Sequence, residues 1–194
     1  VQYALLALLY QLAQSGATGG LVDLLILRDE TGAYNGYSGD VSSIIAALGF
    51  IGGALAVWST AKLLITKNKE DMHLSHLKKE GKAKYALLVA ATIGAVIGFN
   101  LLFELLGVTN KSEAYTEVAA QQYSAHFIVG ILVFGFISPI AEELLFRGVI
   151  YGYLRRFMDI KLAIALSALI FGVYHMNYVQ GVYGFLIGCL MAYA

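Results

Sequence analysis

The sequence predicts an all-α fold, a polytopic bundle of transmembrane helices. Hydrophobic residues make up 59% of the 194 residues and charged residues only 13%, whereas an ordinary soluble domain has about 45–50% apolar and about 25% charged residues. The mean hydropathy is +0.71. Several apolar stretches also reach the length of about 20 residues that a helix needs to cross a hydrocarbon core of about 30 Å. Membrane lipid is therefore the first expected partner.

Hydropathy predicts about five to six spans along the chain. Two shorter apolar stretches, Leu162–Tyr174 and Gly181–Ala194, follow the long ones, and the second is interpreted as a span cut off by the end of the chain, so the fold is expected to be truncated at its C-terminus. Residues 1–28 are ambiguous because glycines interrupt them, which favours a broken or interfacial segment. The stretches long enough to span are Ser43–Ile65, Tyr85–Gly107 and His126–Leu154.

The expected organisation is a single membrane-embedded domain over residues 1–194. It comprises a broken or interfacial segment (1–40), two spans joined by a basic cytoplasmic loop (41–124) and the helices that carry the candidate motifs (125–194). Lys and Arg gather in loops 66–84 and 154–161, which the positive-inside rule places in the cytoplasm, with 29–40 and 108–124 outside. We expect a multi-pass integral protein of the plasma (inner) membrane of a prokaryote.

Charge and motif content exclude several classes of function. Thirteen basic and thirteen acidic residues cancel, so the basic surface of a nucleic-acid-binding protein is missing and no nucleic-acid partner is expected. The single cysteine, Cys189, supports neither a disulfide framework nor a cysteine zinc site. No Gly-x-Ser-x-Gly elbow, His-Glu-x-x-His motif or phosphate-binding glycine loop is present in the sequence.

Two further features predict helix packing. Small residues in GxxxG spacing occur at Gly148/Gly152 and at Gly184/Gly188, where they would let helix backbones approach closely. Asn100 and Glu104 share one face of the second long span, and we expect hydrogen bonding between helices there.

Three charged residues in the third long span are the candidate catalytic group. A charge deep in a span costs about 2.5–3.5 kcal/mol on insertion scales, so Glu142, Glu143 and Arg147 each require a partner or a function. Glu143 and Arg147 lie four apart, on one helix face, and can form an ion pair. Glu142 points about 100° away and is a candidate general base acting on water. Pro139 removes a backbone hydrogen bond and can kink the helix beside the glutamates.

The next apolar stretch adds a histidine at its end. His175 follows Phe171 by one helical turn on the same face. Beside Glu142, this histidine could orient the attacking water, share its proton or bind a metal. The alternative is a structural role, in which the charges form a clasp between helices and the histidine is an interfacial or capping residue.

The pattern Glu142-Glu143-x-x-x-Arg147 followed by Phe171-x-x-x-His175 resembles the first two motifs of the CPBP family, which comprises the CaaX prenyl endopeptidases and bacteriocin-processing enzymes. The resemblance covers about residues 124–194. It implies an intramembrane endopeptidase in which Glu142 and His175 activate water and Glu143 with Arg147 supports them. Phe171 would shape the substrate pocket. The implied substrate is a peptide or lipidated peptide, either a prenylated CaaX tail or a leader or bacteriocin-related peptide.

The sequence leaves two questions about the site open, the metal and the third motif. Glu142 and His175 supply two ligands for a divalent, zinc-like metal, whereas a catalytic zinc usually takes three, so both a metal-dependent and a glutamate mechanism are compatible. The family's third motif, a histidine followed four residues later by Asn or Asp, is absent before Ala194, and His73, His76 and His126 do not replace it. The chain is expected to continue, and the 194-residue form is expected to be inactive without that motif. The rival function is a non-catalytic membrane immunity or scaffold protein.

Overall fold

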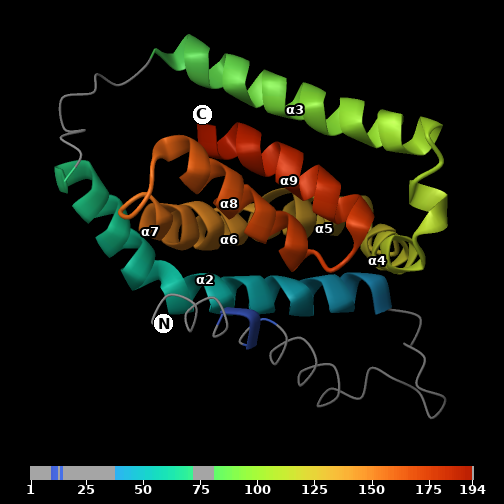
Figure 1. The fold of residues 1–194 in the computed structure, drawn as a ribbon. Helices are drawn as coiled ribbons and strands as arrows, with labels where there is room; N and C mark the ends of the chain where they lie inside the picture. The colour runs from blue at the N-terminus through green and yellow to red at the C-terminus, as the bar shows by residue number, and fades with distance from the viewer. Residues whose placement is uncertain (1–9, 13, 15–37, 72–80, 194) are drawn as a thin grey trace. The chain divides into compact units, whose positions relative to one another are not determined.

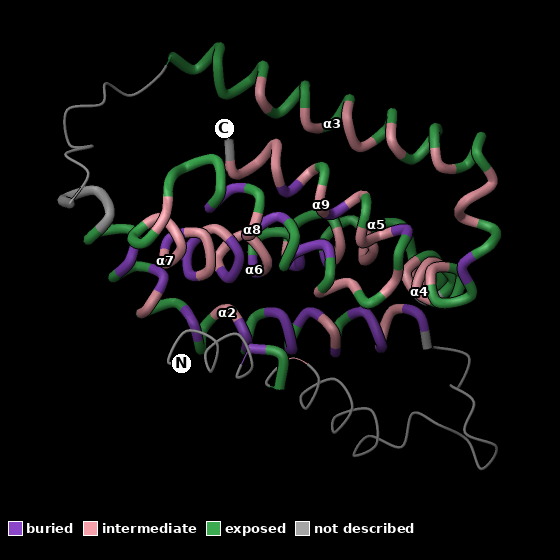
Figure 2. Tube along the Cα trace, viewed as in Figure 1, coloured by how far each residue is buried: buried purple, intermediate pink, exposed green. Residues whose placement is uncertain are grey.

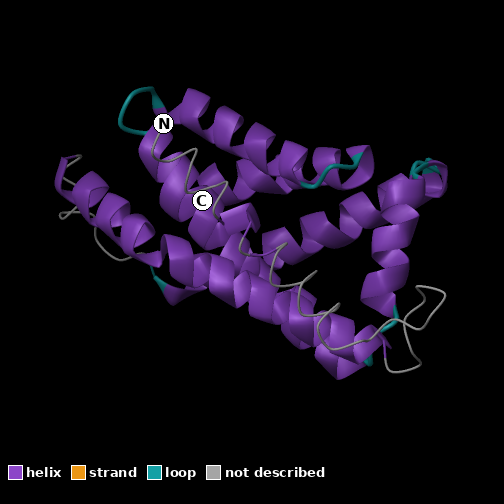
Figure 3. Cartoon of the chain, turned by 90° about the horizontal axis from the view of Figure 1, so that it is seen from below, coloured by secondary structure: helices purple, strands orange, loops and turns teal. Residues whose placement is uncertain are grey.

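The structure, a computed structural model, describes residues 10–12, 14, 38–71 and 81–193, and these form helices joined by turns, without a strand among them (Figure 3). The all-α prediction is therefore confirmed. Expectations for most of the N-terminal segment (residues 1–9, 13 and 15–37), and for His73 and His76, fall outside the described residues. Three helices are long and apolar enough to cross a membrane, Gly39–Lys67, Lys82–Leu105 and Phe127–Leu154, and two shorter apolar helices follow, Ile160–Tyr174 and Tyr178–Ala192. The chain is an integral membrane protein.

Contacts divide the chain into two compact units. The first unit comprises residues 1–63 and 118–149, and the second comprises residues 64–117 and 150–194. The expected single domain over 1–194 stays a prediction.

The long helix α2 (Ser38–Asp71) provides one side of the first unit. From Phe50 onward its buried residues recur every three or four positions and so form one stripe, and Figure 2 shows repeated purple segments along α2. The opposite face is also apolar, with Leu48, Leu55 and Trp58 more than half exposed. A helix that is apolar on both faces needs protein on one side and lipid on the other. Buried residues of α2 include Ser43, Ala47, Phe50, Val57 and Ala61.

The third predicted span is one helical run that alternates between two hydrogen-bonding patterns (Figure 1). It consists of α5 (Phe127–Gly130), η3 (Ile131–Ile137), α6 (Ser138–Glu143), η4 (Leu144–Tyr151) and α7 (Gly152–Leu154), and the two η segments are π-helical. At the end of η3 the backbone N–H of Ser138 donates to the carbonyl of Val133, five residues earlier. Pro139 follows directly, at the start of the α-helical stretch α6, and lacks the N–H that would continue the hydrogen-bond ladder. Hydropathy predicted the span but not this π-helical pattern, which is often found at functional sites.

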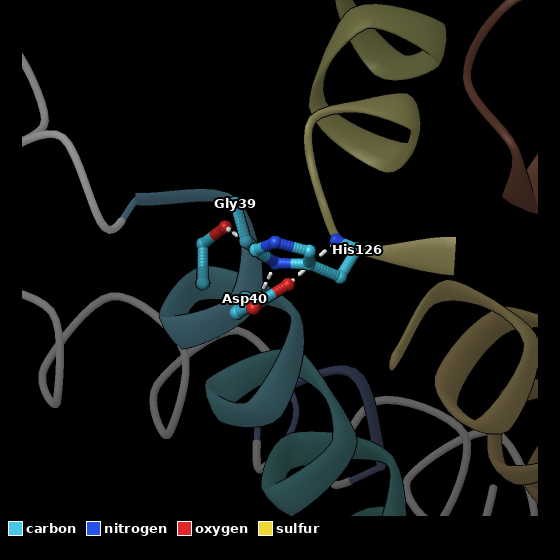
Figure 4. Close-up of polar contacts among 4 residues, drawn as sticks. Gly39, Asp40 and His126 are labelled. Atoms are coloured by element: carbon cyan, nitrogen blue, oxygen red, sulfur yellow. Dashed lines mark hydrogen bonds and ion pairs between the residues drawn. The ribbon is translucent and has the colours of Figure 1, made fainter. Parts of the chain in front are cut away.

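Two hydrogen bonds join the start of α2 to the start of α5 (Figure 4). One Asp40 carboxylate oxygen accepts the backbone N–H of His126 and the other lies 2.6 Å from the ring nitrogen Nδ1. Because an ionised carboxylate only accepts hydrogen bonds, Nδ1 carries the hydrogen. Next to this contact, Gly39 lies so close to the main chain of Ser124 that a Cβ would clash. His126 is therefore a helix-joining residue.

In the second unit, the exposed helix α3 (Lys82–Leu105) lies against α9 (Tyr178–Tyr193). Phe99 meets Tyr183 edge to face with ring centroids 6.3 Å apart, and the Asn100 side chain donates to the carbonyl of Val96 within α3 at 2.9 Å. The predicted hydrogen bonding between helices at Asn100 and Glu104 stays a prediction. The helix ends where Gly107 adopts a φ of 61°, a conformation that glycine reaches without a Cβ penalty.

The segment between α3 and the third span, expected as a loop, contains more helix than the sequence predicted. A short 3₁₀ turn, η2 (Thr109–Lys111), precedes the eleven-residue helix α4 (Glu113–Tyr123). Ser112 caps this helix, since its hydroxyl accepts the backbone N–H of Tyr115 at 3.2 Å. Hydropathy alone misses α4 because its composition is mixed rather than apolar.

Helices α8 (Ile160–Tyr174) and α9 pack side by side through small residues (Figure 1). A Cβ placed on Gly172 would lie 2.5 Å from the carbonyl oxygen of Gly181, and one on Gly188 would lie 3.1 Å from the Cβ of Ala168. The predicted close approach at Gly184/Gly188 is confirmed, as it is for Gly148, whose added Cβ would lie 2.9 Å from that of Ala61.

Gly172→Ala is expected to destabilise the protein by about 1–3 kcal/mol, because the new methyl group meets backbone that cannot rotate away. Gly94→Ala in α3 is the matched control, since an added Cβ there meets nothing within 4 Å and alanine favours a helix. Thermal unfolding in detergent measures both variants. Equal melting temperatures for the two would show that α8 and α9 do not need this contact.

Candidate active site

The two adjacent glutamates end α6, between the π-helical segments η3 and η4. Both side chains are partly exposed, whereas Ala141 and Leu145, on either side of them, are almost fully buried. The structure therefore places Glu142 and Glu143 in an apolar helix with part of each side chain left uncovered by the described residues of the protein.

Glu142 is held by a serine one helical turn earlier. The hydroxyl of Ser138 donates to Oε1 of Glu142 at 2.8 Å, and Ser138 is only 8% exposed. The spacing of four residues places both side chains on one helix face. Ser138 carries no charge and so does not stand out in an apolar span, although its Ser-x-x-x-Glu spacing to Glu142 is visible in the sequence.

Glu143 has a different partner. Its Oε1 lies 3.1 Å from Nη1 of Arg147, and the side chains are 37% and 13% exposed, respectively. The predicted ion pair at i, i+4 is confirmed. The two neighbouring carboxylates are thus distinguished, since a cation neutralises Glu143 and a hydroxyl binds Glu142.

The motif histidine ends α8 in the second unit. His175 caps the helix, and its Nδ1 lies 2.9 Å from the carbonyl oxygen of Phe171. A carbonyl only accepts, so Nδ1 carries the hydrogen, and Nε2 of the neutral ring has a lone pair. Phe171 packs against the ring edge to face with centroids 4.9 Å apart. A Cβ on Gly184 of α9 would lie 3.4 Å from the same ring, so a glycine on the neighbouring helix accommodates the imidazole.

The turn after His175 is held in an unusual shape. Met176 has a φ of 56°, a region that few non-glycine residues adopt. Asn177 then caps α9, because its Oδ1 accepts the backbone N–H of Gln180 at 2.8 Å and its Nδ2 donates to the carbonyl of His175 at 3.1 Å. An Asn followed three residues later by Gln is a capping-box pattern, a signal that could have identified this turn from the sequence.

An apolar cavity of about 560 Å³ lies between α8 and α9 on the side of this turn. Its wall is mainly aliphatic and aromatic, with Asn177 as a polar member. Lining residues include Leu169, Val173, Met176, Val182 and Phe185. Phe171 packs on His175 instead, so its predicted role in shaping a substrate pocket stays a prediction.

The residues of the first motif lie together in the first unit, and those of the second motif lie together in the second unit. Ser138, Glu142, Glu143 and Arg147 belong to the first unit, and Phe171 and His175 belong to the second. The predicted sharing of one water by Glu142 and His175 stays a prediction.

A zinc-like metal would need further ligands. Among the described residues, no group of three or more His, Cys, Asp or Glu side chains could hold a metal ion, and Glu142 with His175 supplies two donors where a catalytic zinc usually takes three protein ligands. A metal held by Glu142 and His175 therefore stays a prediction.

Comparison with known families agrees with the motif pattern. Residues 124–194 match the family model described as Rce1-like, type II CAAX prenyl endopeptidase Rce1-like. The matched residues contain both motifs, so the resemblance to the CPBP membrane endopeptidases is confirmed for this part of the chain. No curated protein and no solved structure gave a significant match to the chain.

Proposed function

We propose that this chain, Rce1-like over residues 124–194, is an intramembrane endopeptidase that hydrolyses a peptide bond in or near the bilayer with water activated by Glu142. The observation that carries the proposal is the hydrogen bond from Ser138 to Glu142, which gives one carboxylate of the first motif a fixed direction. A carboxylate of this kind in an apolar helix is suited to general-base catalysis.

In the proposed reaction each motif residue has a separate role. Glu142 takes a proton from water as the oxygen attacks the scissile carbonyl, and the protonated carboxyl then gives that proton to the departing amine, so protons balance over one turnover. His175, with its hydrogen on Nδ1, accepts a hydrogen bond at Nε2 and orients the same water. Arg147 holds Glu143 in an ion pair, which keeps a second carboxylate from competing for the water's proton.

The substrate is proposed to be a peptide or lipidated peptide at the membrane, either a prenylated CaaX tail or a leader or bacteriocin-related peptide. Support for cytoplasmic access comes from the basic loops on that side of the third span, and the proposed location is the plasma membrane of a prokaryote. No step requires a metal, and a divalent ion at Glu142 and His175 is the alternative that a chelator tests.

Liposomes containing the purified full-length protein provide the decisive experiment. A prenylated C-terminal peptide and an unlipidated leader-type peptide are offered separately in isotopically labelled water, and products are identified by mass spectrometry. We expect one of them to be cut, with label from water in the new carboxyl group. If neither peptide is cut by correctly folded protein, the scaffold function replaces the protease.

A further inference from the structure

One polar side chain beside the glutamates is not part of either motif. Ser138 is 8% exposed in the middle of an apolar span. A serine in such a helix usually bonds the carbonyl four residues earlier. Here its hydroxyl instead donates forward to Oε1 of Glu142 at 2.8 Å. Its single hydrogen is therefore directed at the proposed base.

Local backbone structure explains why this direction is available. The N–H of Ser138 bonds to Val133, five residues earlier, at the end of the π-helical segment η3, and Pro139 begins the α-helical turn that contains Glu142. From Ser138 onward the chain is α-helical up to Glu143, which places the serine one turn below Glu142 on the same face. The change from π-helix to α-helix therefore places Ser138 and Glu142 one turn apart on the same helix face.

The two glutamates differ in what holds them. Glu143 is bound by the cation of Arg147, which is itself charged and neutralises it. Glu142 accepts a hydrogen bond from a neutral hydroxyl, which fixes one carboxylate oxygen and limits rotation of the group. In a poorly solvated site such a hydrogen bond is stronger than in water.

We propose that Ser138 is a positioning residue that orients Glu142 for its attack on the proton of water. This role rests on the proposed endopeptidase function, since it acts through Glu142. It adds a fourth contributor to the first motif, four residues before the first glutamate.

Kinetics of three variants test this role. Ser138→Ala is expected to lower kcat about tenfold with KM changed less than about twofold, because the base is misdirected while substrate binding is not. Ser138→Thr keeps the hydroxyl and is expected to retain kcat within about threefold of wild type. Ser43→Ala, which removes a hydroxyl from a serine that is 2% exposed in α2, is the matched control and is expected to behave like wild type.

A double-variant cycle separates positioning from general destabilisation. In a Glu142→Gln background, Ser138→Ala is expected to cause little further loss, because the group it positions no longer acts as a base. Equal tenfold losses in both backgrounds, or an unchanged kcat for Ser138→Ala, would overturn the proposal. Should threonine be too large for the site, Ser138→Cys, a weaker donor of similar size, is expected to fall between alanine and wild type.

Infrared spectroscopy tests the contact without depending on turnover. The carboxylate bands of Glu142, assigned by difference from Glu142→Gln, are expected to shift in Ser138→Ala and to stay in place in Ser43→Ala. If wild type hydrolyses no peptide, the proposed function fails, and the infrared shift still decides whether Ser138 holds Glu142. If wild type hydrolyses peptide and no shift is seen, the positioning role alone fails.

Discussion

Glu142→Gln is expected to lower kcat about 10²–10⁴-fold, the range that removal of a general base produces. Glutamine keeps the shape of the side chain and an oxygen that can accept the hydroxyl of Ser138, but it takes up no proton from water. The fold should therefore survive the change while the chemistry is lost. Initial rates of peptide hydrolysis in liposomes measure kcat and KM, and thermal unfolding in detergent checks that the variant melts like wild type.

Glu104→Gln is the matched control for this change, because it removes one carboxylate from an exposed position in α3, outside the matched residues 124–194. We expect it to hydrolyse substrate at the wild-type rate. If Glu142→Gln does so too, Glu142 is not the base. The two glutamates and the arginine would then be the structural clasp that the sequence also allows.

Much of the fold could be predicted from hydropathy, because crossing a membrane demands long apolar helices. The third span was predicted at His126–Leu154 and is observed at Phe127–Leu154. Hydropathy does not encode hydrogen-bond register, so the π-helical segments η3 and η4 were missed. It also says nothing of amphipathic helix α4, whose start depends on the cap at Ser112.

Spacing predicted the contacts within each motif, because residues four apart on a helix must be neighbours. The Glu143–Arg147 ion pair and the Phe171–His175 stacking follow from that rule alone. The hydrogen on Nδ1 of His175 could not be predicted, since it depends on where the ring lies relative to a backbone carbonyl. The role of Ser138 was missed for another reason, namely that serine is common in membrane helices and carries no charge.

His175→Asn is expected to lower kcat by about 10²-fold or more, close to the loss caused by His175→Ala. The Asn amide can occupy the place of Nδ1 and donate to the carbonyl of Phe171, as the imidazole does at 2.9 Å. It has no atom in the place of Nε2. The two variants therefore separate the role of Nδ1, which bonds the carbonyl of Phe171, from the proposed role of Nε2, which orients the water. Hydrolysis rates and melting temperatures measure the two effects.

A purely structural histidine gives the opposite pattern, with His175→Asn near wild type in rate and only His175→Ala impaired. The same assay with a chelator addresses the metal alternative. A wild-type rate that survives chelation supports the glutamate mechanism. A loss of activity that added zinc restores would instead make His175 a metal ligand, with Nε2 as the coordinating atom because Nδ1 is committed to Phe171.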